Sequence, residues 1–546
     1  MTKRLILCAC GLLAMLVASA AQGQEKYSQQ WNMCNANLSS DAGMKQFIAL
    51  MKQSKDCGCT HILVGDSAWL RSADNAQYVA RVGEVKKAAK DMGVTLVPSV
   101  FAFGYSGRYL GFNPNLGAGL PVKDMPFVVK GKTAAPDSTP ILDAAKFMSK
   151  VEDGEYRQEM KLPQFMYYKV TLRTSAYPFS KDQDGQDEKE PFRAAGHVGD
   201  GMRWLTRTNT HMAQKGDEWV STNTFNTLDS DSVLFRVKVA DLKLVKDVKI
   251  ELAGPLFILR RDNLKQDLTP LKVTSEDGKT VYEEGKDFKR LVDPQISQGS
   301  GDFDQEKGRY NNIELTDNSR IKDGQKILVS FFHSYKIYAD QNSITLEDPA
   351  VYEIMQKDVS GCAKVWDTGH YFMNFDEIRI CGWENQAVTP GKTLADITKR
   401  GYDMIRAADP KSVIYTWSDM YAPQQNAWPA GWTNAKGEKM PANYYLLHGT
   451  WGGAEAGLAK DVIVCNWVSS PEGLKFFADR GHSQVLCGYY DQTTTKGMKE
   501  NITTWKKDSA GVPNILGFMY TQWGSGFGHM KEYFELVNSY DQWGGK

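Results

Sequence analysis

Short apolar runs alternate with amphipathic segments over the first hundred residues of the chain. The runs are nearly continuous, which is typical of strands that are buried on both faces of a parallel sheet. They predict strands at 31–38, 61–65 and 94–103. After the first run, Ser39-Ser40-Asp41 precedes a segment in which Met44, Phe47 and Met51 recur at helical spacing. A capped amphipathic helix is therefore expected there, and a second helix at 75–92.

The pattern changes in the middle of the chain. Residues 104–132 are rich in Gly and Pro and predict a long loop. From residue 155 to residue 345 apolar positions recur with a period of two, as where Phe235 and Val237 alternate with Arg236 and Lys238. This period is typical of half-exposed antiparallel strands, and Asp277-Gly278 predicts a hairpin turn between two of them. The region is interpreted as an inserted, β-sandwich-like domain.

The first pattern then resumes. Five further strands are predicted at 371–375, 412–417, 461–467, 484–490 and 515–523, and helical stretches follow most of them. Eight mostly buried strands that alternate with helices are typical of a (β/α)8 TIM barrel. We expect an α/β fold, a TIM barrel with a β-sandwich-like domain inserted after the third barrel strand. The expected domains are a signal peptide at 1–23, a first barrel part at 24–150, the inserted domain at 151–345 and the rest of the barrel at 346–546.

Composition excludes several classes of protein. Apolar residues make up 42% of the 546 residues and charged residues 24%, the balance of an ordinary globular protein. A disordered chain, a collagen and a polytopic membrane protein are excluded. The 65 basic residues equal the 65 acidic ones, so no overall basic field attracts nucleic acid, and none is expected as a partner.

The N-terminus has the pattern of a secretory signal. Lys3 and Arg4 precede an apolar run, and Ala18-Ser19-Ala20 follows it as a small-residue cleavage site. The run is too short to cross a bilayer. We therefore expect an exported protein, periplasmic or secreted, without a membrane span.

Cysteine usage leaves the redox state open. Two of the nine cysteines leave with the signal, and the remaining seven are an odd number, so at least one is unpaired. Cys381, Cys465 and Cys487 lie in or beside apolar runs and are predicted to be buried free thiols. A disulfide from Cys34 to Cys57 or Cys59 is one alternative that the sequence leaves open.

Carboxylates, amides and aromatic residues gather where the predicted strands end. The active sites of TIM barrels lie at the C-terminal ends of the strands. The candidate residues there are Asn35, Asp66, Asp376, Glu377, Arg379, Trp417, Asp419, Trp467, Tyr489, Tyr490, Asp491 and Trp523. Carboxylates perform acid–base work on glycosides and aromatic faces stack on sugar rings, so this composition predicts a sugar site.

Each candidate also has a structural alternative. Asp66 and Asp419 can equally be helix caps, and the tryptophans can fill the top of the barrel. Asp376-Glu377 is harder to explain structurally. Two adjacent acids after a buried strand cost stability unless they are solvated, paired or functional. The sequence therefore predicts a catalytic role for this pair.

The segment Tyr371-Phe372-Met373-Asn374-Phe375-Asp376-Glu377-Ile378 resembles the Asp-Glu motif on strand four of glycoside hydrolase family 20, the β-N-acetylhexosaminidases. The resemblance implies that Glu377 is the general acid/base. It implies that Asp376 assists by holding the 2-acetamido group of the substrate, which acts as the nucleophile. By the same resemblance Tyr489 or Tyr490 contacts that group, and Trp467 and Trp523 form walls of the pocket.

The sequence departs from the family pattern at three points. Met373-Asn374-Phe375 replaces the His-x-Gly that precedes Asp-Glu, and Gly524 replaces the Glu that follows the tryptophan of strand eight. The β domain is inserted into the barrel instead of preceding it. The expected function is that of a distant, family-20-like glycosidase, which acts on an oligo- or polysaccharide. The resemblance implies an N-acetylhexosamine in that substrate, and the departures from the family pattern leave the requirement for the N-acetyl group open.

Two alternatives remain open at this point. In a retaining glycosidase with a protein nucleophile, Asp491 or Asp419 would take that role beside Glu377. A catalytically inactive, glycan-binding barrel would keep the aromatic residues but would not need the acidic pair. The sequence predicts neither a cofactor nor a metal ion, and it leaves the formation of a homodimer open.

Overall fold

The structure is a computed structural model. It describes residues 27–139, 142–143, 151–152, 155–178, 192–198, 201–205, 212–239, 241–253, 258–261, 268–291, 312–338, 341–425, 446–467, 470–489, 491–492, 494–524 and 526–539. The predicted signal peptide at 1–23 and Tyr490 lie outside the described residues. Within the described part, no helix is both long enough and apolar enough to cross a membrane.

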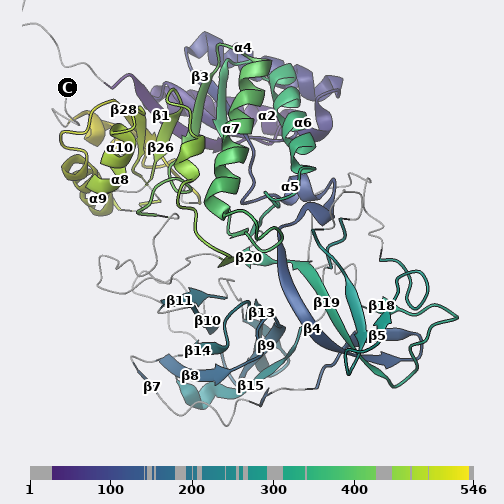
Figure 1. Ribbon diagram of the computed structural model, residues 1–546. Helices are drawn as coiled ribbons and strands as arrows, with labels where there is room; N and C mark the ends of the chain where they lie inside the picture. Colours follow the sequence, from purple (N-terminus) through teal and green to yellow (C-terminus); the bar gives the residue numbers. More distant parts are fainter. Residues whose placement is uncertain are drawn as a thin grey trace, which may run out of the picture.

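Eight parallel strands close into a barrel, which confirms the predicted fold class (Figure 1). Every predicted barrel strand overlaps an observed one. In their order around the barrel they are β1 (Gln29–Asn35), β2 (His61–Gly65), β3 (Thr95–Val100), β22 (His370–Met373), β24 (Val413–Trp417), β26 (Ile463–Asn466), β27 (Gln484–Cys487) and β28 (Ile515–Tyr520).

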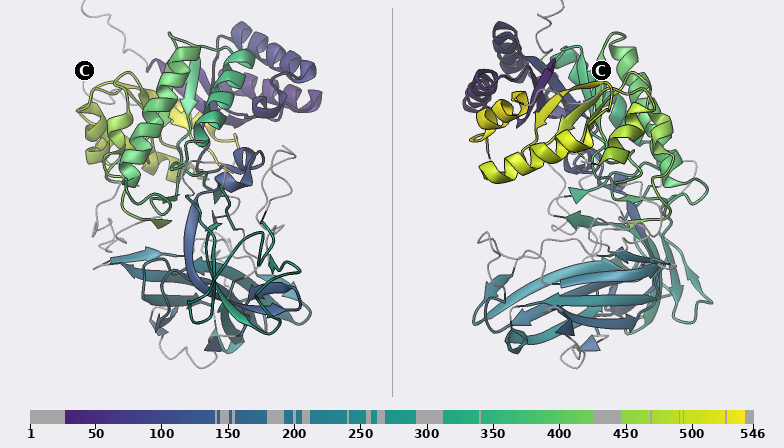
Figure 2. Two further views of the ribbon diagram at one scale, coloured as in Figure 1. Left: turned by 45° about the vertical axis from the view of Figure 1, so that its right-hand side comes forward. Right: turned by 90° about the vertical axis from the view of Figure 1, so that its left-hand side faces the viewer.

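Amphipathic helices surround the barrel (Figure 2). They are α2 (Asp41–Asp56), α4 (Ala76–Met92), α6 (Val351–Val365), α7 (Pro390–Ala408), α8 (Pro471–Ala478), α9 (Thr495–Asp508) and α10 (Met530–Asn538). The side chains of Ser40, Asn75, Thr389, Ser470 and Thr494 accept backbone N–H groups at helix N-termini, which satisfies donors that have no partner within the helix. The predicted caps and helices at 41–56 and 76–92 are thereby confirmed.

In the residues described, the chain between β3 and β22 forms three larger antiparallel sheets and one two-stranded antiparallel sheet, consistent with the inserted β domain. One sheet contains β4 (Gly119–Lys130), β5 (Thr133–Pro136), β16 (Lys272–Ser275), β17 (Val281–Tyr282), β18 (Ile313–Glu314) and β19 (Lys326–Ser334). A second contains β6 (Leu142–Asp143), β9 (Tyr167–Thr174), β12 (Ala213–Lys215), β13 (Glu218–Asn226) and β15 (Val245–Leu252). The third contains β7 (Val151–Glu152), β8 (Glu155–Lys161), β10 (Phe192–Val198), β11 (Gly201–Trp204) and β14 (Ser232–Lys238).

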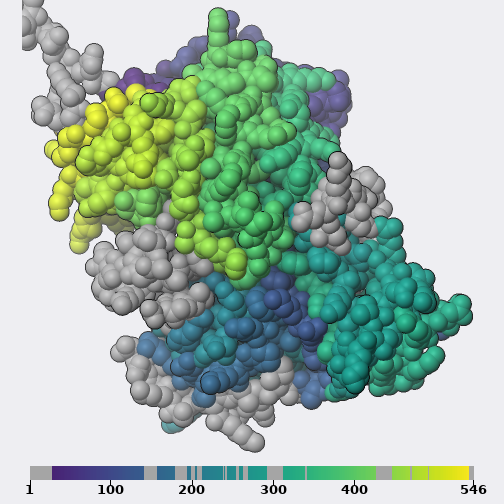
Figure 3. Space-filling model, viewed as in Figure 1, coloured from purple at the N-terminus to yellow at the C-terminus, as the bar shows by residue number. Residues whose placement is uncertain are grey.

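The three inserted sheets share one hydrophobic core. Phe225 of β13 and Phe235 of β14 pack edge to face with ring centroids 5.6 Å apart, so the second and third sheets face each other. Gly278 has φ of 73° in the turn between β16 and β17, as the predicted hairpin requires. The inserted sheets lie below the barrel in Figure 2, and the two parts meet along a continuous contact in Figure 3.

The prediction of a long loop at 104–132 is wrong. This stretch holds the short helix α5 (Gly107–Leu110), the turn η1 (Pro114–Leu116) and the twelve-residue strand β4. Pro121 and Pro126 gave β4 the composition of a loop. In the residues described, the first half of β4 pairs only with β19 and the last four residues pair also with β5. Because a proline removes one N–H, it is tolerated in such a one-sided part of a strand.

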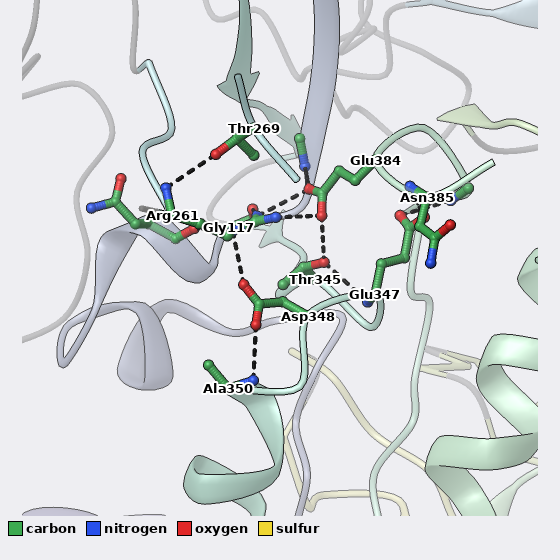
Figure 4. A network of polar contacts seen from close by, with 12 residues as sticks. Gly117, Arg261, Thr269, Thr345, Glu347, Asp348, Ala350, Glu384 and Asn385 are labelled. Carbon is green, nitrogen blue, oxygen red and sulfur yellow. Dashed lines mark hydrogen bonds and ion pairs between the residues drawn. The ribbon is translucent and has the colours of Figure 1, made fainter. Parts of the chain in front are cut away.

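A buried ion pair joins the inserted sheets to the barrel (Figure 4). Arg261 of the insertion pairs with Glu384, in the loop after β22, and the two side chains are 2% and 0% exposed. Arg261 Nη2 donates to Glu384 Oε1 at 3.0 Å, and Arg261 Nε donates to the carbonyl oxygen of Asn115 at 2.6 Å. Thr345 Oγ1 donates to Glu384 Oε2 at 2.8 Å. The junction is therefore held by charged groups whose hydrogen bonds lie inside the protein.

All seven described cysteines are free thiols. Cys381, Cys465 and Cys487 are buried, as predicted. Cys34 and Cys59 are also buried, and burial raises the pKa of both thiols, so neither is activated as a thiolate. The alternative of a disulfide between Cys34 and Cys57 or Cys59 is not the state that the structure shows.

Candidate active site

Three carboxyl groups meet where β22 and β24 end. Asp376 and Glu377 follow β22 by three and four residues, and Asp419 follows β24 by two. The backbone N–H of Glu377 donates to Asp419 Oδ2 at 3.0 Å, which links the two strand ends. Asp419 is 0% exposed and Asp376 7%, whereas the Glu377 side chain is 21% exposed. Glu377 is thus the member of this acidic cluster that reaches solvent most freely.

The backbone of Glu377 is held in a left-handed conformation. Its φ is 46°, which costs free energy in a residue other than glycine and persists only where the surroundings fix it. Asp419 fixes the N–H, and Gln341 Nε2 donates to the Glu377 carbonyl oxygen at 3.0 Å. This turn interrupts the alternation of side chains along an extended strand, so two consecutive acids can belong to one cluster.

Two donors bind the Glu377 carboxylate. Arg379 Nη2 lies 2.6 Å from Glu377 Oε2, and Tyr105 Oη donates to the same oxygen at 2.7 Å. Arg379 is 3% exposed, whereas Tyr105 is 38% exposed and presents its ring at the rim. Burial and the neighbouring carboxylates raise the pKa of Tyr105, so its hydroxyl remains a proton donor.

The acidic cluster retains a proton near neutral pH. Burial raises the pKa of Asp376 well above its usual range, and the charges of Asp419 and Glu377 add to this, partly offset by Arg379. Burial also raises the pKa of Asp419 to about 7, with the charge of Glu377 acting in the same direction. One guanidinium cannot balance three ionised carboxylates in a buried site, so the proton is shared by the cluster.

Aromatic side chains stand beside the acids. Trp417 is buried, donates from Nε1 to Asn374 Oδ1 at 3.0 Å and packs 6.4 Å from the Trp523 ring. Trp523 is 53% exposed, and Trp467 is half-buried with its side chain hydrogen-bonded to Asp419. Exposed aromatic faces next to carboxylates can pack against a sugar ring while the carboxylates exchange protons with it.

Asp491 lies at the same rim but its carboxylate binds backbone groups. Both of its oxygens accept the N–H of Trp523, at 2.8 and 2.9 Å, and its own φ is 55°. Asp491 therefore fixes the turn that carries the exposed indole. Tyr489 is 0% exposed and stacks on Tyr520 with ring centroids 3.8 Å apart. The structure places Tyr489 in the core between barrel and helices, whereas Tyr490 lies outside the described residues.

The remaining candidates, Asn35 and Asp66, are not joined to the acidic cluster by the hydrogen bonds of the described residues. Asn35 is exposed, and its side chain lies against Gly65 of the neighbouring strand. Asp66 is buried, and it accepts the Ala68 N–H at 2.9 Å and the Tyr78 hydroxyl at 2.7 Å. These contacts tie Asp66 to the chain that follows β2, but Asp66 caps neither helix there, because the N-cap of α3 (Trp69–Ser72) has no side-chain hydrogen bond and α4 is capped by Asn75.

Three contributors to the site have no signal in the sequence pattern. Tyr105 and Gly104 fall in the stretch that predicted a loop, and Gln341 belongs to the end of the insertion. A Cβ on Gly104 would overlap the carbonyl oxygen of Asp376 and lie 2.9 Å from the carbonyl carbon and oxygen of Glu377. Only glycine allows the loop after β3 to approach the acids so closely.

Gly104→Ala is expected to lower the catalytic activity by about 100-fold, since backbone atoms would have to move and small displacements of reacting groups are costly. Gly83→Ala is the matched control, because a Cβ at this exposed helical position meets nothing within 4 Å. That control should keep full activity and melt at the same or a slightly higher temperature. Full activity in a correctly folded Gly104→Ala variant would contradict the close approach.

Among the residues that the structure describes, no three or more His, Cys, Asp and Glu side chains are arranged to hold a metal ion.

Comparison with known proteins gives structural likeness only. No family model and no curated protein matches the sequence. Among solved structures the chain is similar to a Flavobacterium johnsoniae chitobiase of glycoside hydrolase family 20, with 15% identity, a TM-score of 0.24 and coverage of 35% of this chain and 27% of that one. It is similar to Dispersin B, with 11% identity, a TM-score of 0.24 and coverage of 36% and 60%.

A third similar structure contains the family 20 catalytic modules of the pneumococcal exo-β-D-N-acetylglucosaminidase StrH. Identity is 9%, the TM-score is 0.32, and the match covers 94% of this chain and 82% of that one. The matches to the first two structures span less than two thirds of their length. The chitobiase and StrH are family 20 enzymes, but at this similarity they assign no role to any residue of this chain.

Proposed function

We propose that this protein is an exported glycoside hydrolase in which Glu377 is the general acid/base and Asp376 assists. One observation carries the proposal. Three carboxyl groups meet at the C-terminal ends of the barrel strands β22 and β24, burial raises the pKa of Asp376 and of Asp419, and the exposed Tyr105 donates to the Glu377 carboxylate. The cleavage of a glycosidic bond requires paired carboxyl groups with different pKa values, one to donate a proton and one to remain ionised.

The roles follow from exposure and hydrogen bonding. Glu377 is the most exposed of the three acids, so it is the one that can approach the glycosidic oxygen and protonate it. Asp376 lies next to it and is placed to stabilise positive charge that develops on the sugar. Asp419 holds the Glu377 backbone and adds the negative charge that keeps a proton in the cluster.

The nucleophile is proposed to come from the substrate. Asp491 has both oxygens on the Trp523 N–H, and Asp419 is fully buried with one oxygen on the Glu377 N–H. Neither carboxylate is presented to a sugar as a retaining glycosidase with a protein nucleophile would need. The 2-acetamido group of an N-acetylhexosamine supplies a nucleophile without one, so an oligo- or polysaccharide that contains this sugar is the proposed substrate.

A panel of aryl glycosides tests this function, with aryl N-acetylhexosaminides beside the corresponding plain hexosides. The proposal predicts release of the phenol from N-acetylhexosaminides only. Hydrolysis of plain hexosides would mean that Asp491 or Asp419 is the nucleophile, and it would contradict a mechanism in which the 2-acetamido group of the substrate is the nucleophile. Failure to cleave any member of the panel, or a mixture of natural oligosaccharides, would favour the glycan-binding alternative.

The shared proton makes activity depend on pH in a defined direction. Burial and the neighbouring carboxylates raise the pKa of Asp376, so the cluster keeps a proton to higher pH than isolated carboxyl groups do, and kcat/KM should fall on the alkaline side, where that proton is lost. Asp419→Asn removes a negative charge that raises the pKa of Asp376. The alkaline limb of the profile should therefore move to lower pH in this variant. A profile of kcat/KM against pH measures the shift, and an unchanged or higher alkaline limb would contradict the shared proton.

A further inference from the structure

The inserted domain returns to the barrel through a segment that touches the acidic cluster. We define residues 341–343 as the return segment; its first two residues form β21 (Gln341–Asn342), which pairs with β20 (Lys336–Tyr338) at the junction in Figure 1. Gln341, Asn342 and Ser343 are all buried. Their polar atoms face three different parts of the site.

Gln341 bridges the ion pair at the centre of the site. Its Oε1 accepts Arg379 Nε at 2.7 Å, and its Nε2 donates to the Glu377 carbonyl oxygen at 3.0 Å. Gln341 Nε2 also lies 3.5 Å from Glu377 Oε2. A single buried amide thus aims the guanidinium at the Glu377 carboxylate and holds the left-handed peptide that carries this carboxylate.

The other two residues of the return segment support the same arrangement. Ser343 Oγ accepts the backbone N–H of Arg379 at 3.2 Å. The carbonyl oxygen of Asn342 accepts both the backbone N–H of Ser106, at 2.9 Å, and its hydroxyl. Ser106 follows Tyr105, the second donor to the Glu377 carboxylate. Both donors to Glu377 are therefore positioned by the insertion.

We infer that the return segment is part of the catalytic site, and that Gln341 is a positioning residue that acts through Arg379 and the Glu377 backbone. This inference rests on the proposed function. It gives the inserted domain a role in catalysis, because the barrel alone supplies Glu377 and Arg379 but not the amide that orients them. Gln341 itself touches no reacting atom.

A double-mutant cycle tests the inference on the aryl glycoside that the wild type cleaves best. Gln341→Met keeps the size of the side chain and removes the amide; it should lower kcat by about 30- to 100-fold and leave KM within about threefold, since positioning is lost and binding is not. Arg379→Lys keeps the charge but lacks the Nε–H group that Gln341 accepts. In that background Gln341→Met should cost clearly less than in the wild type, about three- to tenfold, because the contact with Arg379 is already lost and only the contact with the Glu377 carbonyl oxygen remains to be removed.

Gln30→Met is the matched control. Gln30 is 5% exposed and its Nε2 donates to Asn538 Oδ1 at 2.8 Å near the start of β1, away from the strand ends that carry the acids. Gln30→Met should lower the melting temperature, while kcat stays within about twofold of the wild-type value. If Gln341→Met does not fold, Ser343→Ala removes only one acceptor of Arg379 and should lower kcat by about three- to tenfold.

The outcomes separate this inference from the function on which it rests. An unchanged kcat in Gln341→Met, or an equal loss in the wild-type and Arg379→Lys backgrounds, would overturn the inference and leave the glycosidase intact. If Ser343→Ala is used because Gln341→Met does not fold, an unchanged kcat in Ser343→Ala would likewise overturn the inference. A wild-type protein that cleaves no glycoside would overturn the proposed function and remove this inference with it.

Discussion

Glu377→Gln is expected to lower kcat/KM for glycoside hydrolysis by about 100- to 10,000-fold, the range over which general acid–base groups contribute. The amide has almost the size of the carboxyl group but cannot give a proton to the glycosidic oxygen. It also loses the charge that pairs with Arg379. Steady-state rates and a thermal melt of the same preparation would measure the effect and show that the fold is kept.

The matched control for this variant is Glu353→Gln. Glu353 is exposed in the first turn of α6, so the same chemical change is made on the same barrel outside the acidic cluster. Its activity should equal that of the wild type. On a substrate whose leaving phenol is weakly acidic, a Glu377→Gln variant that retained more than about a tenth of the wild-type activity would show that Glu377 is not the acid/base, because removal of a general acid costs more than that.

Glu384→Gln is expected to destabilise the protein by about 3–5 kcal/mol, the cost of removing one partner from a buried ion pair. Arg261 is 2% exposed and cannot reach water to replace the lost charge. Asp348 Oδ2 lies 3.7 Å from Arg261 Nε, which is too long for a good hydrogen bond. Arg261 Nη2 also donates to the Gly117 carbonyl oxygen, but this neutral group does not replace the lost negative charge. The midpoint of urea-induced unfolding, followed by tryptophan fluorescence, measures the change.

A surface ion pair provides the comparison for Glu384→Gln. Lys475 and Asp479 pair at 2.6 Å on α8, with side chains 70% and 56% exposed. Asp479→Asn should change the stability by less than about 1 kcal/mol, because solvent already screens that pair. Equal effects of the two substitutions would show that the junction does not depend on the buried ion pair.

The barrel was predictable because its signal is local. Each barrel strand is buried on both faces, so it appears in the sequence as a short and nearly continuous apolar run. Strand β4 was missed for a physical reason as well. Proline is excluded from most strands, and β4 contains Pro121 and Pro126. Only the pairing partner β19, which lies about two hundred residues away in the sequence, shows that both prolines are tolerated here.

In the candidate site, too, residues with a local sequence signal were predicted and residues that depend on contacts between distant segments were not. Asp376, Glu377 and Asp419 were found because the C-terminal ends of barrel strands must converge, and the structure joins them. The burial of Tyr489 and the hydrogen bond between Asp66 and the Tyr78 hydroxyl depend on neighbours that no single segment reveals. Gln341 was unpredictable because its importance comes from two contacts made across the end of an insertion.

The most direct test of the account is a leaving-group series for wild type and Glu377→Gln. The substrates are aryl N-acetylhexosaminides whose phenols range from a strongly acidic dinitrophenol to a weakly acidic phenol, and kcat/KM reports the step that breaks the glycosidic bond. A dinitrophenolate departs without help from an acid, so the variant should lose little activity on that substrate and should lose most on the weakly acidic phenol. An equal loss across the whole series would contradict protonation of the leaving oxygen by Glu377.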